Sequence, residues 1–385
     1  MDFDAIIGHQ HIKKHLLSSL QKGRIPHAQL FVAPQGTGAL PMALAYAKQL
    51  LCFSDKNGVW TENPSARLKF DKLVHPDLHF AFPVTTTDRI KTKPVSDLFI
   101  EEWRQFVLEN PYRNVFDWMQ YLGIEKKQGQ IGVDEAQLIL KKLSLKAYEG
   151  TFKVLIVWMA EKMNTSAANK LLKLIEEPPK NTVLILITEN EDRLLKTITS
   201  RCQTLRFLPL PETIIRKGLQ DNFDKSPQEA HQIAVQAQGN WHKACQLISQ
   251  ETSETVFEDW FILWIRTAFR AKGNAAVIND LIGWSTTIAG TGRETQKQFL
   301  AYCLSFFRQA LLQNYKTDAL VYLQPKTANF SLKKFAPFVN HANILEITSE
   351  IETASYHIER NGNAKIILLD LSIKLTRLLH QKAEA

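Results

Sequence analysis

“KVLIVWMAEKMNTSAANKLLKLIEEPPKNTVLILIT” (residues 153–188) holds two apolar runs on either side of an amphipathic stretch. The runs 153–159 and 182–188 are rich in Val, Ile and Leu without alternation, which is typical of central parallel strands covered on both faces. The stretch between them has a polar helix-start candidate at Asn164 or Thr165 and ends in a Pro-Pro pair, which stops a helix. Strand, helix and strand in this order predict a parallel α/β sheet.

The same alternation of helices and apolar runs extends outward over the first 208 residues. “LPLPE” (208–212) ends it, and only helical apolar periodicity follows. We therefore predict an α/β core at 1–208, a small helical domain at 209–250 and a C-terminal helical domain at 251–385. Residues 85–127, a polar loop followed by an amphipathic helical stretch, are interpreted as an insertion in the core. The expected strands are 28–33, 77–82, 129–133, 153–159, 182–188 and 204–208.

The composition is that of a soluble globular protein. The apolar share is 45% and the charged share is 22%. A chain of 385 residues is long enough for two or three domains with hydrophobic cores of their own. The longest apolar run, Val154 to Ala160, is far shorter than the roughly 20 residues of a membrane span. The acidic start “MDFDAIIGHQ” has no signal-peptide pattern, so we expect no membrane association and a cytoplasmic location.

The net charge of +8 leaves the kind of partner open. A polyanion such as DNA fits a basic chain, but a solvated basic surface explains the dispersed lysines and arginines equally well. The four cysteines show no C-x-x-C spacing and predict neither disulfides nor zinc. His75, Asp77 and His79 would share one face of a strand, which makes them a candidate metal site. No further ligand cluster is evident, and ordinary polar residues are the favoured interpretation.

“AQLFVAPQGTGALPMALAYAKQLL” (28–51) has the outline of a phosphate-binding loop: a strand, a glycine turn and a helix. The motif G-x-x-x-x-G-K-[ST] needs a lysine and a hydroxyl after the last glycine. Gly36 and Gly38 are present, but Ala39 and Leu40 stand in the lysine and hydroxyl positions. Because these groups hold the phosphates and Mg²⁺, productive ATP binding is not expected.

A second part of such a site is also absent. Nucleotide hydrolases carry acidic residues at the end of a neighbouring strand, where they hold Mg²⁺ and orient water. Here that strand ends in Trp158 and Met159, and Glu161 comes two residues too late. Two independent losses predict an idle nucleotide site.

“TSRCQTLRF” places Arg201 between a short helix and a strand, with Ser200 and Cys202 as neighbours. A surface arginine in a salt bridge of little energetic value is the simplest interpretation of this position alone.

Three segments together change that interpretation, because they resemble the AAA+ clamp-loader family: “FDAIIGHQHIKKHLLSSLQKGRIPHAQLFVAPQGTG”, “NTSAANKLLKLIEEPP” and “SRC”. The resemblance implies an α/β AAA+ core (a parallel sheet flanked by helices), a small helical lid and an all-α C-terminal collar domain. A degenerate phosphate loop combined with an intact SRC is similar to the members of the bacterial DNA polymerase III clamp loader that do not hydrolyse ATP.

The resemblance also implies roles for particular residues. Arg201 matches the arginine finger that acts in trans on the ATP-Mg of a neighbouring gamma or tau subunit, while Ser200 and Cys202 shape the turn. His242 replaces the nucleotide-sensing arginine of the lid, and the cysteines of the family's zinc module are missing apart from Cys52. The chain would bind no cofactor or metal itself. Its partners would be the gamma/tau and delta subunits, the sliding clamp and, within the complex, primed DNA.

Three alternatives remain open at this point. An active AAA+ ATPase with an atypical loop would bind Mg-ATP tightly as an isolated chain. A metal enzyme built on His75, Asp77 and His79 would contain stoichiometric metal. A stand-alone DNA-binding protein would bind DNA tightly and salt-dependently without partners.

Overall fold

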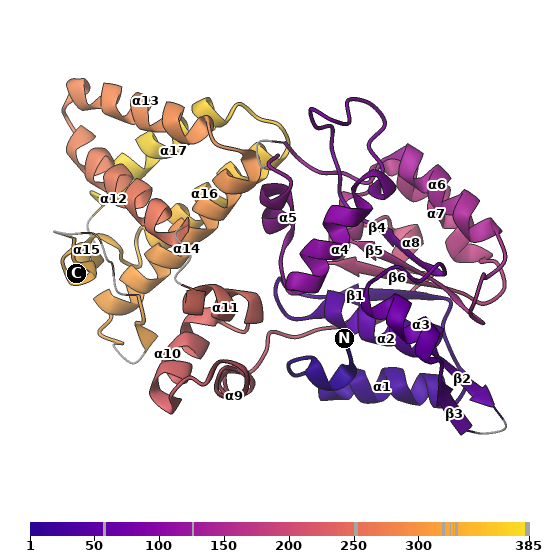
Figure 1. Ribbon diagram of the computed structural model, residues 1–385. Helices are drawn as coiled ribbons and strands as arrows, with labels where there is room; N and C mark the ends of the chain where they lie inside the picture. The colour runs from indigo at the N-terminus through magenta and orange to yellow at the C-terminus, as the bar shows by residue number, and fades with distance from the viewer. Residues whose placement is uncertain are drawn as a thin grey trace. The chain divides into compact units, whose positions relative to one another are not determined.

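The apolar runs that the sequence predicts as central strands are β5 and β6, paired in parallel with Lys153 opposite Thr182. They lie in a five-stranded sheet with the order β4-β5-β6-β1-β7 (Figure 1). The computed structural model describes residues 1–56, 59–124, 127–249, 253–317, 320–323, 325, 327 and 330–381. The strands are β1 (Ala28–Val32), β2 (Phe53–Lys56), β3 (Val59–Glu62), β4 (Leu78–Ala81), β5 (Lys153–Trp158), β6 (Thr182–Thr188) and β7 (Gln203–Arg206); β2 and β3 form a separate antiparallel pair.

Two compact units make up the chain, one of residues 1–124 and 128–248, the other mainly of residues 249–385. The helices of the first unit are η1 (Phe3–Ala5), α1 (Gln10–Gln21), α2 (Ala39–Cys52), α3 (Pro64–Asp71), η2 (Ser96–Phe99), α4 (Ile100–Glu109), α5 (Val115–Tyr121), α6 (Val133–Ser144), η3 (Ala160–Lys162), α7 (Thr165–Glu176), η4 (Glu191–Arg193), α8 (Lys196–Thr199), α9 (Glu212–Phe223), α10 (Pro227–Ala237) and α11 (Trp241–Ser249). Those of the second are α12 (Ser253–Ala271), α13 (Ala275–Ala289), α14 (Arg293–Asn314), α15 (Leu332–Phe335), η6 (Ala336–Phe338), α16 (Ile344–Glu359) and α17 (Ala364–Leu378).

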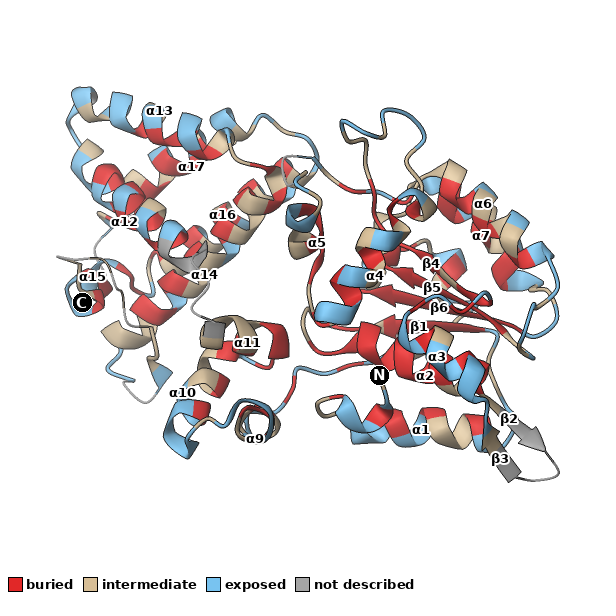
Figure 2. Ribbon diagram, viewed as in Figure 1, coloured by how far each residue is buried: buried red, intermediate tan, exposed pale blue. Residues whose placement is uncertain are grey.

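The central strands β5 and β6 are buried on both faces, as their unbroken apolar runs predict (Figure 2). Successive side chains of a strand point to opposite faces. Accordingly, Val154 and Ile156 join the cluster that includes α2, whereas Leu155 and Val157 join the cluster under α6 and α7. The loops at the carboxyl ends of β1, β5 and β6 are thereby held on a rigid support.

Most of the predicted core elements are present with shifts of one or two residues at their ends. Asn164 caps α7, since its side chain accepts a hydrogen bond from the N–H of Ala167. The predicted strand at 129–133 is wrong: this segment makes only isolated bridges to Val84 and Met163, and α6 begins at Val133. Two glycines within five residues weaken the strand preference of this segment, which accounts for the error.

Helices α9, α10 and α11, here called the lid helices, follow the core within the first unit. They share a small hydrophobic cluster centred on Ile215, Leu219 and Trp241. Tyr112, from the segment 85–127 that is predicted to be an insertion, belongs to the same cluster although it lies 129 residues before Trp241 in sequence. The proposed boundary between core and lid at residue 208 therefore remains a prediction.

The second unit is helical in the part that the structure describes, with a core of its own. Phe261, Trp264 and Phe306 are fully buried in it. The indole N–H of Trp264 donates to Ser372 Oγ at 2.8 Å, which ties α12 to α17. Within the described residues, no helix is both long enough and apolar enough to span a membrane.

Candidate functional site: a filled phosphate loop and an exposed arginine

Residues 33–40, here called the phosphate-loop segment, connect β1 to α2 with the geometry that the glycines predict. The N–H of Ala33 donates to Thr188 O at 2.9 Å, which continues the pairing with β6. Gly36 and Gly38 adopt φ values of +69° and +101°, in the region that glycine tolerates best, and Gly38 occupies the N-cap position of α2. The strand-turn-helix frame of a phosphate site is thus intact.

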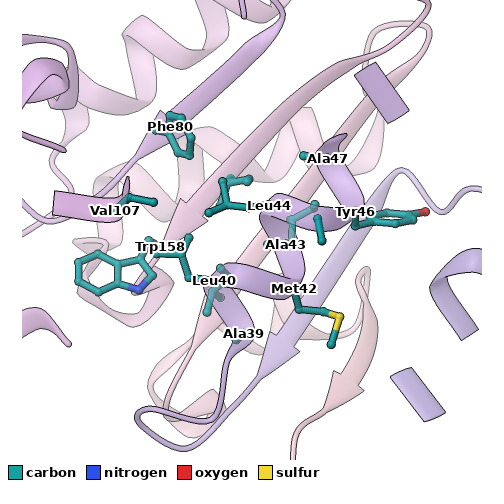
Figure 3. Packing of buried hydrophobic residues seen from close by; sticks show 14 of the residues in the cluster. Ala39, Leu40, Met42, Ala43, Leu44, Tyr46, Ala47, Phe80, Val107 and Trp158 are labelled. Atoms are coloured by element: carbon teal, nitrogen blue, oxygen red, sulfur yellow. The ribbon is translucent and has the colours of Figure 1, made fainter. Parts of the chain in front are cut away.

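The side chains that would act on a phosphate are absent from this frame. Ala39 and Leu40 are 7% and 4% exposed and belong to the core cluster under the sheet. Figure 3 shows Leu40 and Trp158 in this packing, with Val107 beside Trp158. Met159, at the position of an acidic residue in a hydrolase, has a left-handed φ of +58° and is also buried. These four positions offer neither a cation nor a ligand for Mg²⁺.

Backbone groups of the phosphate-loop segment are bonded within the chain. Gly36 O accepts the N–H of Trp241, the first residue of α11, at 3.0 Å. Thr37 O lies 2.9 Å from Nε2 of the buried His9, and burial lowers the pKa of that imidazole. The remaining cavity measures about 40 Å³, whereas pockets for small ligands are typically about 300–1,000 Å³. It is lined by residues 33–41, residues 111–114, Trp158, Met159, Ile187 and Glu189.

Residues 111–114, in the segment predicted to be an insertion, supply one wall of this cavity, which the sequence did not reveal. The hydroxyl of Tyr112 accepts the N–H of Ile7 at 3.0 Å, and its ring lies against Gly38, where an added Cβ would meet it at 3.0 Å. Asn114 and Asp117 form a capping box at the start of α5. Asp117 Oδ2 also lies 2.8 Å from Nε2 of His242 on α11, although the direction is not that of a hydrogen bond.

Glu161 is the acidic residue that sits nearest in sequence to the expected catalytic position. Its Oε1 accepts the N–H of Glu189 at 3.0 Å, so the carboxyl group links η3 to the end of β6. Burial raises its pKa. Its Oε2 is buried and has no hydrogen-bond partner among the described residues.

Arg201 lies between α8 and the edge strand β7, as predicted, and is 40% exposed. Its Nε lies 2.7 Å from Glu176 Oε1, at the end of α7, and Nη1 donates to Thr197 O at 3.0 Å. Nη1 also lies 3.3 Å from Ser200 Oγ. Cys202 is half-buried, and burial raises the pKa of its thiol to about 11, so it brings no charge to this surface. Arg201 therefore forms a surface salt bridge, with Glu176, as the simplest interpretation of its position predicts.

The structure places Asp77 as an acceptor for a neighbouring loop, not as a member of a metal site with His75 and His79. β4 begins at Leu78, so the three residues do not share a strand face. The Asp77 carboxylate accepts the backbone N–H groups of Tyr148, Glu149 and Gly150 at 2.7, 2.9 and 3.0 Å. Burial lowers the pKa of His79 to about 4. No group of three or more His, Cys, Asp or Glu residues suited to a metal occurs in the part of the chain that the structure describes.

The structure brings Gly36, Gly38, Ala39 and Leu40 together with Trp158 and Met159 at one edge of the sheet. His242 is near this group through Asp117, whereas Arg201 is not among the residues that line the cavity. Sequence reasoning missed Tyr112, Asn114 and Asp117. The polar and aromatic residues of “NPYRNVFD” (110–117) could have marked this segment as a candidate. Nothing in the local sequence predicts that it packs beside the phosphate-loop segment.

A family model described as DNA polymerase III, delta subunit, matches residues 8–211. The chain is 32% identical over 223 residues to DNA polymerase III subunit delta' of Bacillus subtilis, covering 58% of this chain and 54% of that protein. It is 41% identical over 91 residues to subunit delta' of Escherichia coli, covering 24% and 27%. To subunit gamma of Buchnera aphidicola it is 27% identical over 251 residues, covering 64% and 57%. The matches thus span about half the length of these relatives, or less.

Proposed function

Because the chain belongs to the family described as DNA polymerase III, delta subunit, we propose that it is a clamp-loader subunit that binds no ATP and serves a neighbour's ATP site. In this proposal it assembles with gamma or tau and with delta subunits in the cytoplasm. The complex opens a sliding clamp and places it on primed DNA during replication. The match of the family model to residues 8–211 and the similarity to delta' subunits support this role.

The observation that carries the proposal is the contrast between the filled cavity and the exposed arginine. The cavity of about 40 Å³ has alanine and leucine in place of the phosphate-binding lysine and hydroxyl. Arg201, in contrast, keeps its guanidinium at the surface of the first unit. A subunit can lose its own nucleotide chemistry and still contribute a cation to the site of another subunit.

Arg201 would act on charge that develops as the γ-phosphoryl group is transferred. Its guanidinium presents five N–H donors in a rigid fork that matches phosphate oxygens. Such a finger typically accelerates hydrolysis by about 10³–10⁵-fold. To reach a neighbour's phosphate, the side chain would exchange Glu176 for phosphate oxygens. This exchange costs little, because a surface ion pair contributes only about 0–1 kcal/mol.

Substitution of Arg201 in a reconstituted loader tests the proposal. We expect Arg201→Ala to leave assembly intact and to slow hydrolysis at the adjoining site by about 10³-fold or more, so that the clamp-stimulated total falls by that site's share. Arg206→Ala is the matched control, since Arg206 is a nearby exposed arginine paired bidentately with Glu191. An unchanged total for Arg201→Ala, or an equal loss for both variants, would contradict the finger assignment.

Nucleotide titration of the isolated chain tests the second part of the proposal, that the chain itself binds no ATP. We expect no Mg-ATP binding at concentrations that saturate gamma or tau. Tight binding would instead favour an active ATPase with an atypical loop.

A further inference from the structure

We propose that residues 110–117 of the insertion are a built-in substitute for nucleotide, which fastens the lid helices to the core. In a nucleotide-binding subunit, a ligand between core and lid could bridge the two. Here the chain itself makes the bridge. The inference goes beyond the proposed role of Arg201 and requires no second subunit.

Three contacts carry the inference, and all of them are made by consecutive residues at the start of α11. Trp241 N donates to Gly36 O at 3.0 Å. The Asn240 side chain fills the space above Gly36, where an added Cβ would lie 1.8 Å from Asn240 Oδ1. His242 Nε2 lies 2.8 Å from Asp117 Oδ2. Three consecutive residues of the lid thus rest on the phosphate-loop segment and on α5.

Tyr112 links these contacts to one another. Its ring lies against Gly38 and 6.4 Å from the ring of Trp241, measured between centroids. Its hydroxyl accepts the N–H of Ile7, just before α1. Tyr112 is 7% exposed and is counted in the hydrophobic cluster of the lid helices, not in that of the sheet. One side chain therefore contacts the N-terminal segment, the phosphate loop and the lid.

The site leaves no room for the ligand that it replaces. Pro111, Tyr112, Arg113 and Asn114 line the cavity beside the phosphate loop. What remains, about 40 Å³, is far smaller than a typical small-ligand pocket of about 300–1,000 Å³. The lid is consequently held closed at all times, without regard to the nucleotide concentration.

Hydrogen exchange of the full chain tests this inference. We expect Tyr112→Ala to raise the exchange rates of lid amides (residues 212–249) by about tenfold or more, the effect of losing one packed side chain contact. The strands 153–158 and 182–188 should exchange as in the wild type. Tyr148→Ala is the matched control, because Tyr148 lies in the same unit and is 81% exposed.

The contact between Asp117 and His242 is tested separately. Asp117→Asn and His242→Gln should each loosen the lid, and the double variant should loosen it no more than either single variant, because both remove the same contact. Asn114→Ala breaks the same capping box of α5 without removing Asp117, so it should loosen the lid less.

Three results would overturn the inference. The first is lid exchange in Tyr112→Ala equal to that in Tyr148→Ala. The second is an equal rise in the lid and in the two central strands, which would mean that Tyr112 only stabilises the unit as a whole. The third is slower lid exchange of the wild type on addition of Mg-ATP. All three are read on the isolated chain, so they are independent of the Arg201 assay.

Discussion

Glu135 shows how a single buried carboxyl group can set the pH dependence of stability. It is 2% exposed on α6 and accepts the N–H of Ser96 at 2.5 Å, and burial raises its pKa to about 7. The unfolded chain has a pKa near 4.5 for this group. Between these values the folded state binds more protons than the unfolded state, so the contribution of Glu135 to stability falls as pH rises through this window.

We therefore expect Glu135→Gln to gain stability relative to the wild type as pH rises from about 4.5 to 7, by about 1–3 kcal/mol. Urea unfolding of both proteins at several pH values measures this difference. His79, whose pKa is lowered to about 4, titrates in an overlapping window but is common to both proteins, so it cancels. A difference that stays constant with pH would contradict the assignment.

At the scale of elements, Asp77 acts as a clamp between the start of β4 and the loop before β5. Three backbone N–H groups donate to its carboxylate. Burial by itself would raise the pKa of Asp77, but these hydrogen bonds outweigh burial and lower it. A carboxyl group whose pKa is lowered on folding adds stability above its unfolded pKa of 3.8, and this stability is lost as pH falls through the folded value.

Asp77→Asn should therefore lower the free energy of unfolding at pH 7 by about 2–4 kcal/mol, because an amide cannot accept from all three donors. The same variant should show a shallower loss of stability below about pH 4 than the wild type. Denaturant unfolding at pH 7 and pH 3 gives both values, with Tyr148→Ala as a control that leaves the Tyr148 N–H in place. A cost below about 0.5 kcal/mol would mean that the loop is held by other contacts.

The sequence predicted those elements whose signal is local. β5 and β6 were recognisable from their unbroken apolar residues, and α7 from Asn164 and the proline pair that follows. The strand predicted at 129–133 was wrong, because a short apolar stretch does not indicate whether a neighbouring strand is available for pairing. For the candidate site, the sequence itself shows that the lysine and the acidic residues are absent. It does not predict that Tyr112 and Asp117 lie beside the loop. Their contacts come from folding over more than a hundred residues, such as the 105 between Ile7 and Tyr112.

At the scale of the whole molecule, each of the two units has its own hydrophobic core. We expect a destabilising substitution in one core to leave the stability of the other unit unchanged. Trp264→Ala, at a side chain with no exposed surface, should destabilise the second unit by about 3–5 kcal/mol. Faster hydrogen exchange confined to residues 253–381 would be the result, while the sheet of the first unit is unaffected.

Leu345→Ala provides the matched control, because Leu345 belongs to the second unit and is 80% exposed. Loss of protection in both units for Trp264→Ala would show that the cores are coupled.

The packing of the phosphate-loop segment also makes its buried positions costly to change one at a time. Leu40 and Trp158 now support the core, and Gly36 and Tyr112 support the lid. Restoring a hydroxyl at 40 or a carboxylate at 158 one at a time would insert a polar group into packed apolar surroundings, before any nucleotide could bind. Each such single substitution should therefore lower the stability of the core whether or not nucleotide is present. The packing that fixes Leu40 and Trp158 in the core therefore also fixes the chemical character of this loop.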